Sequence, residues 1–78
     1  MFARAMPFVA TPGAGSAHIN ARTGPGTNYP VLQQFDRSAL LSGIARRLDQ
    51  NGAYWIELDG GGGFVKETVL WAQPARMP

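Results

Sequence analysis

Residues 18–31 read HINARTGPGTNYPV, and this stretch decides the fold of the chain. From His18 to Arg22 the apolar and polar residues alternate, which is the pattern of a half-buried β-strand. Two glycines and two prolines follow in residues 23–30, and they cannot continue a regular element. The sequence therefore predicts a strand that runs into a stiff loop, and that loop carries one large aromatic residue, Tyr29.

The rest of the chain reads as short strands separated by turns. Asn51-Gly52 between apolar runs is the strongest short-range hairpin signal. Gly43 falls inside a predicted strand, where glycine marks a bulge or a close approach. A helix over residues 38–48 is the alternative, because leucines and an isoleucine recur at helical spacing, but Ser42-Gly43 in its middle argues against it. The predicted strands are residues 18–22, 31–35, 40–46, 54–58, 64–66 and 70–72, with a single tight helical turn at 67–69.

The segment at residues 54–58 alternates strictly. Tyr54, Ile56 and Leu58 share one face, and three apolar residues on one side predict that this is the core face. Trp55 and Glu57 share the other face. The pattern therefore predicts that Trp55 lies on the outer or groove-facing side, beside a carboxylate.

The order of these motifs resembles the bacterial SH3-like (SH3b) domain family. Members commonly open with apolar-Asn-apolar-Arg, then Ser/Thr-Gly-Pro-Gly-Thr-x-Tyr and a Val/Ile pair, and residues 19–32 follow this order. Residues 51–58 resemble the family's aromatic strand after a tight turn, and residues 63–70 resemble its closing Gly-aromatic-Val-x-x-x-x-Leu. The resemblance covers residues 17–72 and implies an all-β fold, a small SH3-like barrel of five to six antiparallel strands. Ser38 departs from the glycine that the family usually has at this turn, which suggests a different turn type.

The chain divides into an irregular N-terminal arm at residues 1–16, the barrel at 17–72 and a C-terminal tail at 73–78. Pro7 and Pro12 exclude a helix in the arm. In one interpretation Phe8 and Val9 fold back onto an edge of the barrel. In the other, which we favour, the arm docks onto a partner through its apolar side chains, Phe2, Met6, Phe8 and Val9.

Composition excludes several classes of protein. Seventy-eight residues make one small domain, and the absence of cysteine excludes a disulfide or a thiolate metal site. Six of the seven basic residues are scattered arginines and the net charge is only +2, which argues against a nucleic-acid surface. No stretch approaches the roughly 20 apolar residues of a membrane span, and we identify no signal peptide. The resemblance implies the cell envelope or the extracellular space, with a virion as the alternative.

Catalytic chemistry is not expected. His18 is the only histidine and reads as an exposed or hydrogen-bonded strand residue, and one histidine without cysteine does not make a zinc site. No nucleophile motif surrounds the serines. The five carboxylates fall mainly in predicted turns or on outer faces of strands. We therefore expect no enzyme activity, no metal and no cofactor.

The remaining chemistry is surface recognition. In SH3-like barrels an aromatic groove between the first long loop and the tryptophan strand binds extended peptides. Alternatively, Tyr29 and Trp55 pack the loop onto the barrel. The primary hypothesis is a non-catalytic module that recognises peptide, peptidoglycan or a partner protein. The alternative is a structural accessory subunit of a large assembly, such as a virion or secretion apparatus, anchored by its arm. The candidate groove residues are Asn28, Tyr29, Tyr54, Trp55 and Glu57.

Overall fold

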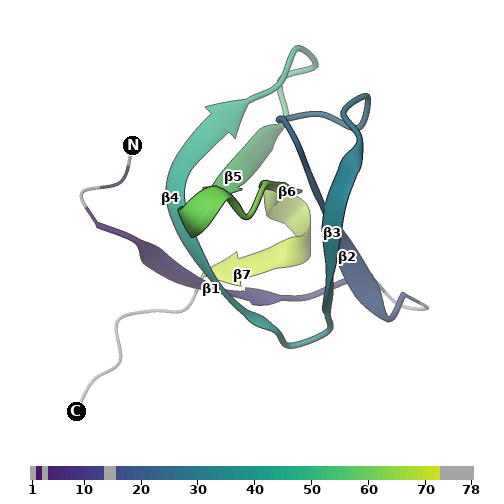
Figure 1. Ribbon diagram of the computed structural model, residues 1–78, viewed down its shortest axis with the longest axis vertical. Coiled ribbons are helices and arrows are strands. Elements are labelled where there is room, and N and C mark those ends of the chain that lie inside the picture. Colours follow the sequence, from purple (N-terminus) through teal and green to yellow (C-terminus); the bar gives the residue numbers. More distant parts are fainter. Residues whose placement is uncertain (1, 3, 14–15, 73–78) are drawn as a thin grey trace.

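The computed structural model describes residues 2, 4–13 and 16–72 of the chain. They form one antiparallel sheet of seven strands in the order β3-β2-β6-β5-β4-β1-β7 (Figure 1). The all-β prediction is confirmed, with seven strands in place of five to six. The predicted tail at 73–78 lies outside the described residues. The elements are β1 (Met6–Ala10), β2 (His18–Arg22), β3 (Val31–Asp36), β4 (Leu40–Leu48), β5 (Tyr54–Leu58), η1 (Asp59–Gly61), β6 (Phe64–Lys66), η2 (Glu67–Val69) and β7 (Leu70–Ala72).

The sheet curls around a single apolar core (Figure 1). Alternate residues of five strands point inward, as the two-residue period of a strand requires. β3 and β7 are the two ends of the strand order, so the sheet is open where they lie. Within the described part of the chain, no helix is long and apolar enough to cross a membrane. The buried core residues are Phe8, Ala10, Ile19, Ala21, Leu41, Ile56, Leu58 and Val65.

The predicted strands from residue 18 onward are confirmed to within two residues, as is the tight turn at Glu67–Val69. The alternative helix over residues 38–48 is wrong, because Leu40–Leu48 forms β4. Gly43 shows why a strand carries a glycine here. A Cβ at Gly43 would lie 2.6 Å from Cγ2 of Ile56 and 2.7 Å from Cε2 of Phe8, and the β4–β5 register shifts just after it.

The turn between β3 and β4 places Ser38 in a left-handed backbone conformation. Ser38 has a φ of 70°, the conformation that glycine adopts most easily. The turn is closed by the backbone N–H of Ala39, which donates to the carbonyl of Asp36 at 3.0 Å. The amide of Ser38 donates to Ala10 of β1 at 2.9 Å. The backbone therefore takes a glycine-like shape with serine in place.

The prediction of an irregular N-terminal arm is wrong for Met6–Ala10, which forms β1 between β4 and β7. Phe8 lies opposite Leu41 of β4, and its side chain is only 6% exposed. The two prolines do exclude a helix, but Pro7 does not prevent a strand. β7 pairs with β1 only from Phe8 onward, so Pro7 lies where β1 has one neighbouring strand, a position that tolerates its missing N–H.

The four side chains predicted to dock onto a partner have different environments. Phe8 is buried in the core of its own chain and is not available to a partner. Phe2 is half-buried, its backbone N–H donates to Ile44 at 2.9 Å, and its ring lies 6.5 Å from that of Phe8. Val9 is half-buried and Met6 is exposed. The apolar pattern that suggested a docking arm therefore belongs largely to an internal strand.

Phe8→Ala should lower the free energy of unfolding by about 3–5 kcal/mol, because it removes a ring from the core. Met6→Ala, the matched control on the same strand, should cost far less, since Met6 is exposed. Urea unfolding measures both values. A domain this small has a thin stability margin, so Phe8→Leu, at about 1 kcal/mol, is the milder variant. Equal losses at Phe8 and Met6 would contradict the assignment of β1 to the core.

Candidate functional site

The loop at residues 23–30 is held to β2 by one side chain. Nη1 of Arg22 donates to the carbonyl of Thr27 at 3.2 Å and to that of Tyr29 at 2.9 Å. The loop also closes on itself, because the amide of Thr23 donates to Pro30 at 3.0 Å. These bonds give the glycine- and proline-rich stretch one defined shape, as its composition predicts.

Tyr29 packs on the backbone of its own loop. A Cβ at Gly24 would lie 2.5 Å from Cε1 of the Tyr29 ring, so only glycine leaves room for it. The ring is nevertheless 40% exposed. Asn28 is exposed beside it, with Oδ1 close to Gly26. Both residues therefore present polar and aromatic surface on a rigid loop, while Tyr29 also seats the loop.

Trp55 is buried, with only 2% of its surface exposed, although the alternation of β5 predicts an outward or groove-facing position. Its indole Nε1 donates to Oδ2 of Asp49 at 2.8 Å. It lies opposite Arg47 of β4 and Lys66 of β6, on the face of β5 away from Ile56. The sequence therefore assigned Trp55 to the correct side of β5, but on that side Trp55 is buried.

Asp49 organises the turn that precedes β5. Its Oδ1 accepts from the backbone N–H groups of Asn51 at 2.8 Å and Ala53 at 2.9 Å. The pKa of Asp49 is held below its ordinary range, first by the bond from Ala53 and then by the bond from Trp55. A nearby positive charge, Lys66, acts in the same direction. Both oxygens of this carboxylate are thus committed to the fold.

Tyr54 is 41% exposed, so the prediction that it faces the core is wrong. It lies opposite Leu48, at the end of β4 and β5 where these strands extend past the core. The guanidinium of Arg46 sits 3.6 Å from the centre of its ring. Arg46 also binds both oxygens of Glu67, at 2.6 and 2.9 Å, and this pairing raises the pKa of Arg46. The exposed face of Tyr54 is therefore partly occupied by a cation of its own chain.

The five predicted groove residues do not gather in one groove. Neighbours on a strand face opposite ways, so Tyr54 and Trp55 lie on different sides of β5. Glu57 is paired with Arg47 at 3.1 Å. It lines a separate hollow with Leu32, Leu58 and Phe64, among others.

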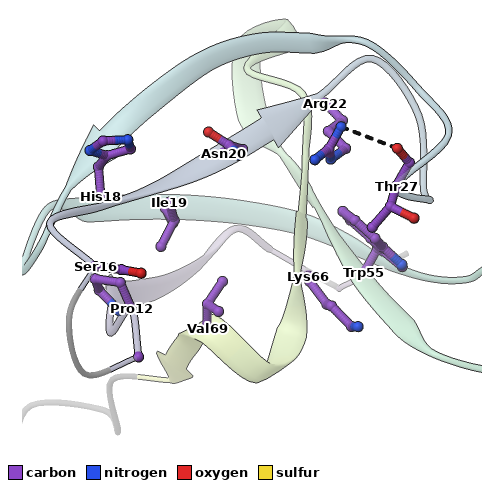
Figure 2. A pocket seen from close by; sticks show the side chains of 11 residues that line it. Pro12, Ser16, His18, Ile19, Asn20, Arg22, Thr27, Trp55, Lys66 and Val69 are labelled. Atoms are coloured by element: carbon purple, nitrogen blue, oxygen red, sulfur yellow. Dashed lines mark hydrogen bonds between the residues drawn. The ribbon is translucent and has the colours of Figure 1, made fainter.

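An open pocket of about 220 Å³ lies where β2 and β6 separate. The two strands share one bridge, between Arg22 and Phe64. Beyond it β2 continues to His18, while β6 ends at Lys66 and turns into η2 (Figure 2). We call this space the β2–β6 pocket. Its lining residues are Pro12, Gly13, Ser16, His18, Ile19, Asn20, Arg22, Thr27, Trp55, Lys66 and Val69.

The pocket lining combines polar and apolar surface in nearly equal parts. Ile19 and Val69 point toward one another across the gap between β2 and η2, whereas His18 and Asn20 project from the other side of β2 (Figure 2). Trp55 and Thr27 lie at the end of the pocket nearest Arg22. His18, the sole histidine, is exposed at the start of β2, as the sequence predicts.

The segment before β2 forms another wall, and Arg37 holds it from the β3–β4 turn. The guanidinium of Arg37 donates to the carbonyls of Pro12 and Gly13, each at 3.3 Å, and of Ser16 at 2.7 Å. The amide of Thr11 donates to Val69 at 2.8 Å. The wall is thus tied both to the turn and to η2, which makes the pocket largely pre-formed.

The charges lining the β2–β6 pocket are of one sign. Arg22 and Lys66 are among its lining residues, and no aspartate or glutamate is. Within the described residues, no three histidine, aspartate or glutamate side chains gather as a metal site would require.

No family model, curated protein or solved structure compared with the chain matches it.

Sequence reasoning missed Arg22 and Lys66 as site residues. The polar face of β2 is visible in the sequence, where polar residues alternate with Ile19 and Ala21. Lys66 is remote from β2 in the chain, and only the bridge between β2 and β6 brings the two strands together. The alternation of β2 could have identified Arg22 as a site residue. Lys66 could be identified only once the pairing of β2 with β6 was known.

Asp49→Asn should lower the urea midpoint at neutral pH, because an amide offers one oxygen where the carboxylate uses two. Since the folded-state pKa is depressed, the carboxylate stabilises the fold fully above its ordinary pKa of about 4. That contribution is lost as the pH falls through the depressed value. Urea unfolding from about pH 7 to about pH 2 should therefore show the deficit of the variant shrinking in acid. Asp36→Asn, at an exposed residue that ends β3, is the control. A deficit that is independent of pH would contradict this role.

Proposed function

We propose that this chain is a non-catalytic binding module of the bacterial SH3-like type, and that it holds an extended peptide in the β2–β6 pocket. The peptide belongs to a cell-wall polymer or to a partner protein. The observation that carries the proposal is the pocket itself, a hollow whose lining combines apolar and polar side chains, as ligand sites commonly do. The exposed loop residues Asn28 and Tyr29 extend the surface that a longer ligand can contact.

Two features support a peptide as the ligand. The volume of about 220 Å³ is below the roughly 300–1,000 Å³ of sites for drug-sized molecules, so it suits one side chain of a longer ligand. The pocket is bounded by the strands β2 and β6, which share one bridge and diverge beyond it, so a ligand can lie along β2 (Figure 2).

A structural subunit of a larger assembly is the second candidate, and one surface favours it. Val9 of β1 lies opposite Leu40 of β4 on one side and opposite Trp71 of β7 on the other. Leu40 is 79% exposed and Trp71 is 67% exposed. These three residues, the outer stripe, share one face of the sheet, and contiguous exposed apolar surface of this kind marks interaction sites.

Thr27→Trp should abolish ligand binding, because a large side chain at this exposed position fills one end of the pocket. The carbonyl of Thr27 that Arg22 uses belongs to the backbone and is retained. The measurement is binding of the purified chain to an array of extended peptides and to purified peptidoglycan. Thr68→Trp, at an exposed threonine outside the pocket, is the matched control and should bind like wild type.

Trp71→Ser separates the two candidates in the same assay. If the pocket binds the ligand, Trp71→Ser keeps binding and Thr27→Trp loses it. If instead Trp71→Ser loses binding and Thr27→Trp keeps it, the ligand binds at the outer stripe and not in the pocket. Failure of the wild-type chain to bind any peptide or peptidoglycan would overturn the pocket proposal.

A further inference from the structure

We infer that the β2–β6 pocket selects ligands that carry a carboxylate next to an apolar side chain. This inference rests on the proposed function and specifies its ligand class. The evidence is the balance of charge around the pocket, the hydrogen-bonding capacity that its arginine retains and the apolar part of its lining.

The positive charges at the pocket are only partly offset by nearby acids. Asp49 interacts electrostatically with Lys66, while its two oxygens accept hydrogen bonds from the Trp55 indole and from two backbone N–H groups. Glu67 follows Lys66 directly in the chain, yet both of its oxygens bind Arg46. Among the described residues no ion pair involves Arg22, and Lys66 is only partly offset by Asp49, so the pocket keeps a net positive charge that can attract an anion.

Arg22 supplies directional donors. Within the described residues, its hydrogen bonds to the loop carbonyls use Nη1 alone, so Nε and Nη2 stay available to a ligand. Because those bonds already fix the guanidinium, a ligand carboxylate meets a pre-organised group. Lys66 adds a second charge on a long flexible side chain that is exposed at the pocket.

The interior selects against polyanions and favours a peptide. Val69, with the edge of the core residue Ile19, gives the pocket apolar surface that an aliphatic side chain can contact. A single-stranded nucleic acid would need stacking platforms and a track of cations along its backbone. Trp55 cannot act as a platform, since it is buried and bonded to Asp49. An aliphatic residue with its carboxylate fits both parts of the pocket.

The test uses two probes of the same size, N-acetyl-leucine and N-acetyl-leucinamide, which differ in the carboxylate alone. Titration of the ¹⁵N-labelled chain followed by amide chemical shifts gives both affinities. The carboxylate probe should bind about tenfold more tightly, as expected for one charge-assisted contact, with shifts at Ile19 and Lys66. Lys66→Gln should remove most of this preference. Arg4→Gln, which loses the same charge at an exposed residue outside the pocket lining, should keep it.

Longer peptides show whether the ligand's carboxylate comes from a chain end or from an acidic side chain. Peptides that end in leucine are compared with a free or an amidated C-terminus, and with or without an aspartate beside the leucine. Preference for the free terminus assigns the site to chain ends, and preference for the aspartate assigns it to acidic side chains. Either preference supports the inference.

Equal affinity for the two leucine probes, or an unchanged preference in Lys66→Gln, would overturn the inference. So would tighter binding of a single-stranded oligonucleotide in the same pocket. If array peptides bind the pocket regardless of their carboxylates, only this inference fails and the proposed function stands. If no peptide binds at all, both fail.

Discussion

The position of Arg22 is the constraint on which the candidate site depends. The register between β2 and β3 shifts just before it, its backbone forms the one bridge to β6, and its side chain holds the 23–30 loop. The start of β6 approaches so closely that a Cβ at Gly63 would lie 2.8 Å from the Arg22 carbonyl oxygen. Gly63 also has a φ of 101°, so glycine is required there on two counts.

The pocket is a consequence of this arrangement. With a single bridge at Arg22, β2 and β6 diverge on the side toward His18, and η2 leaves the space between them open. Trp55 and its bond to Asp49 close one end, while Arg37 fixes the opposite wall. The same arginine that shapes the loop also supplies one of the two positive charges that line the pocket. One residue therefore contributes to both the shape and the charge of the pocket.

Much of the fold could be predicted from the sequence because the signals are local. The alternation at residues 18–22 and the Asn51-Gly52 turn place strands and turns by rules that need no distant contact. Gly43 was correctly associated with a bulge or close approach, and the neighbours it accommodates are Ile56 and Phe8. The favoured interpretation of the arm was wrong because Pro7 and Pro12 resemble a linker, and because its apolar residues fitted a partner's surface as well as an internal core. The alternative, in which Phe8 and Val9 fold back onto the sheet, is confirmed.

The site was harder to predict, since it depends on what covers each face. Alternation correctly placed Trp55 on the side of β5 away from Ile56, but a strand pattern does not show that the loop and Asp49 cover that side. Tyr54 was predicted to be buried and is exposed, because β4 and β5 extend beyond the core at its end. Lys66 was not predicted, as its place beside the pocket arises from a strand pairing remote in sequence.

The most direct test of this account is the backbone mobility of residues 23–30 in Arg22→Gln, measured as ¹⁵N order parameters. Loss of the guanidinium should release the loop from β2, so its order parameters should fall below about 0.6, while the strands stay near about 0.85. Arg47→Gln, which removes a paired surface cation, should leave the loop unchanged. A loop that remains as ordered in Arg22→Gln as in the wild-type chain would contradict the central role of Arg22.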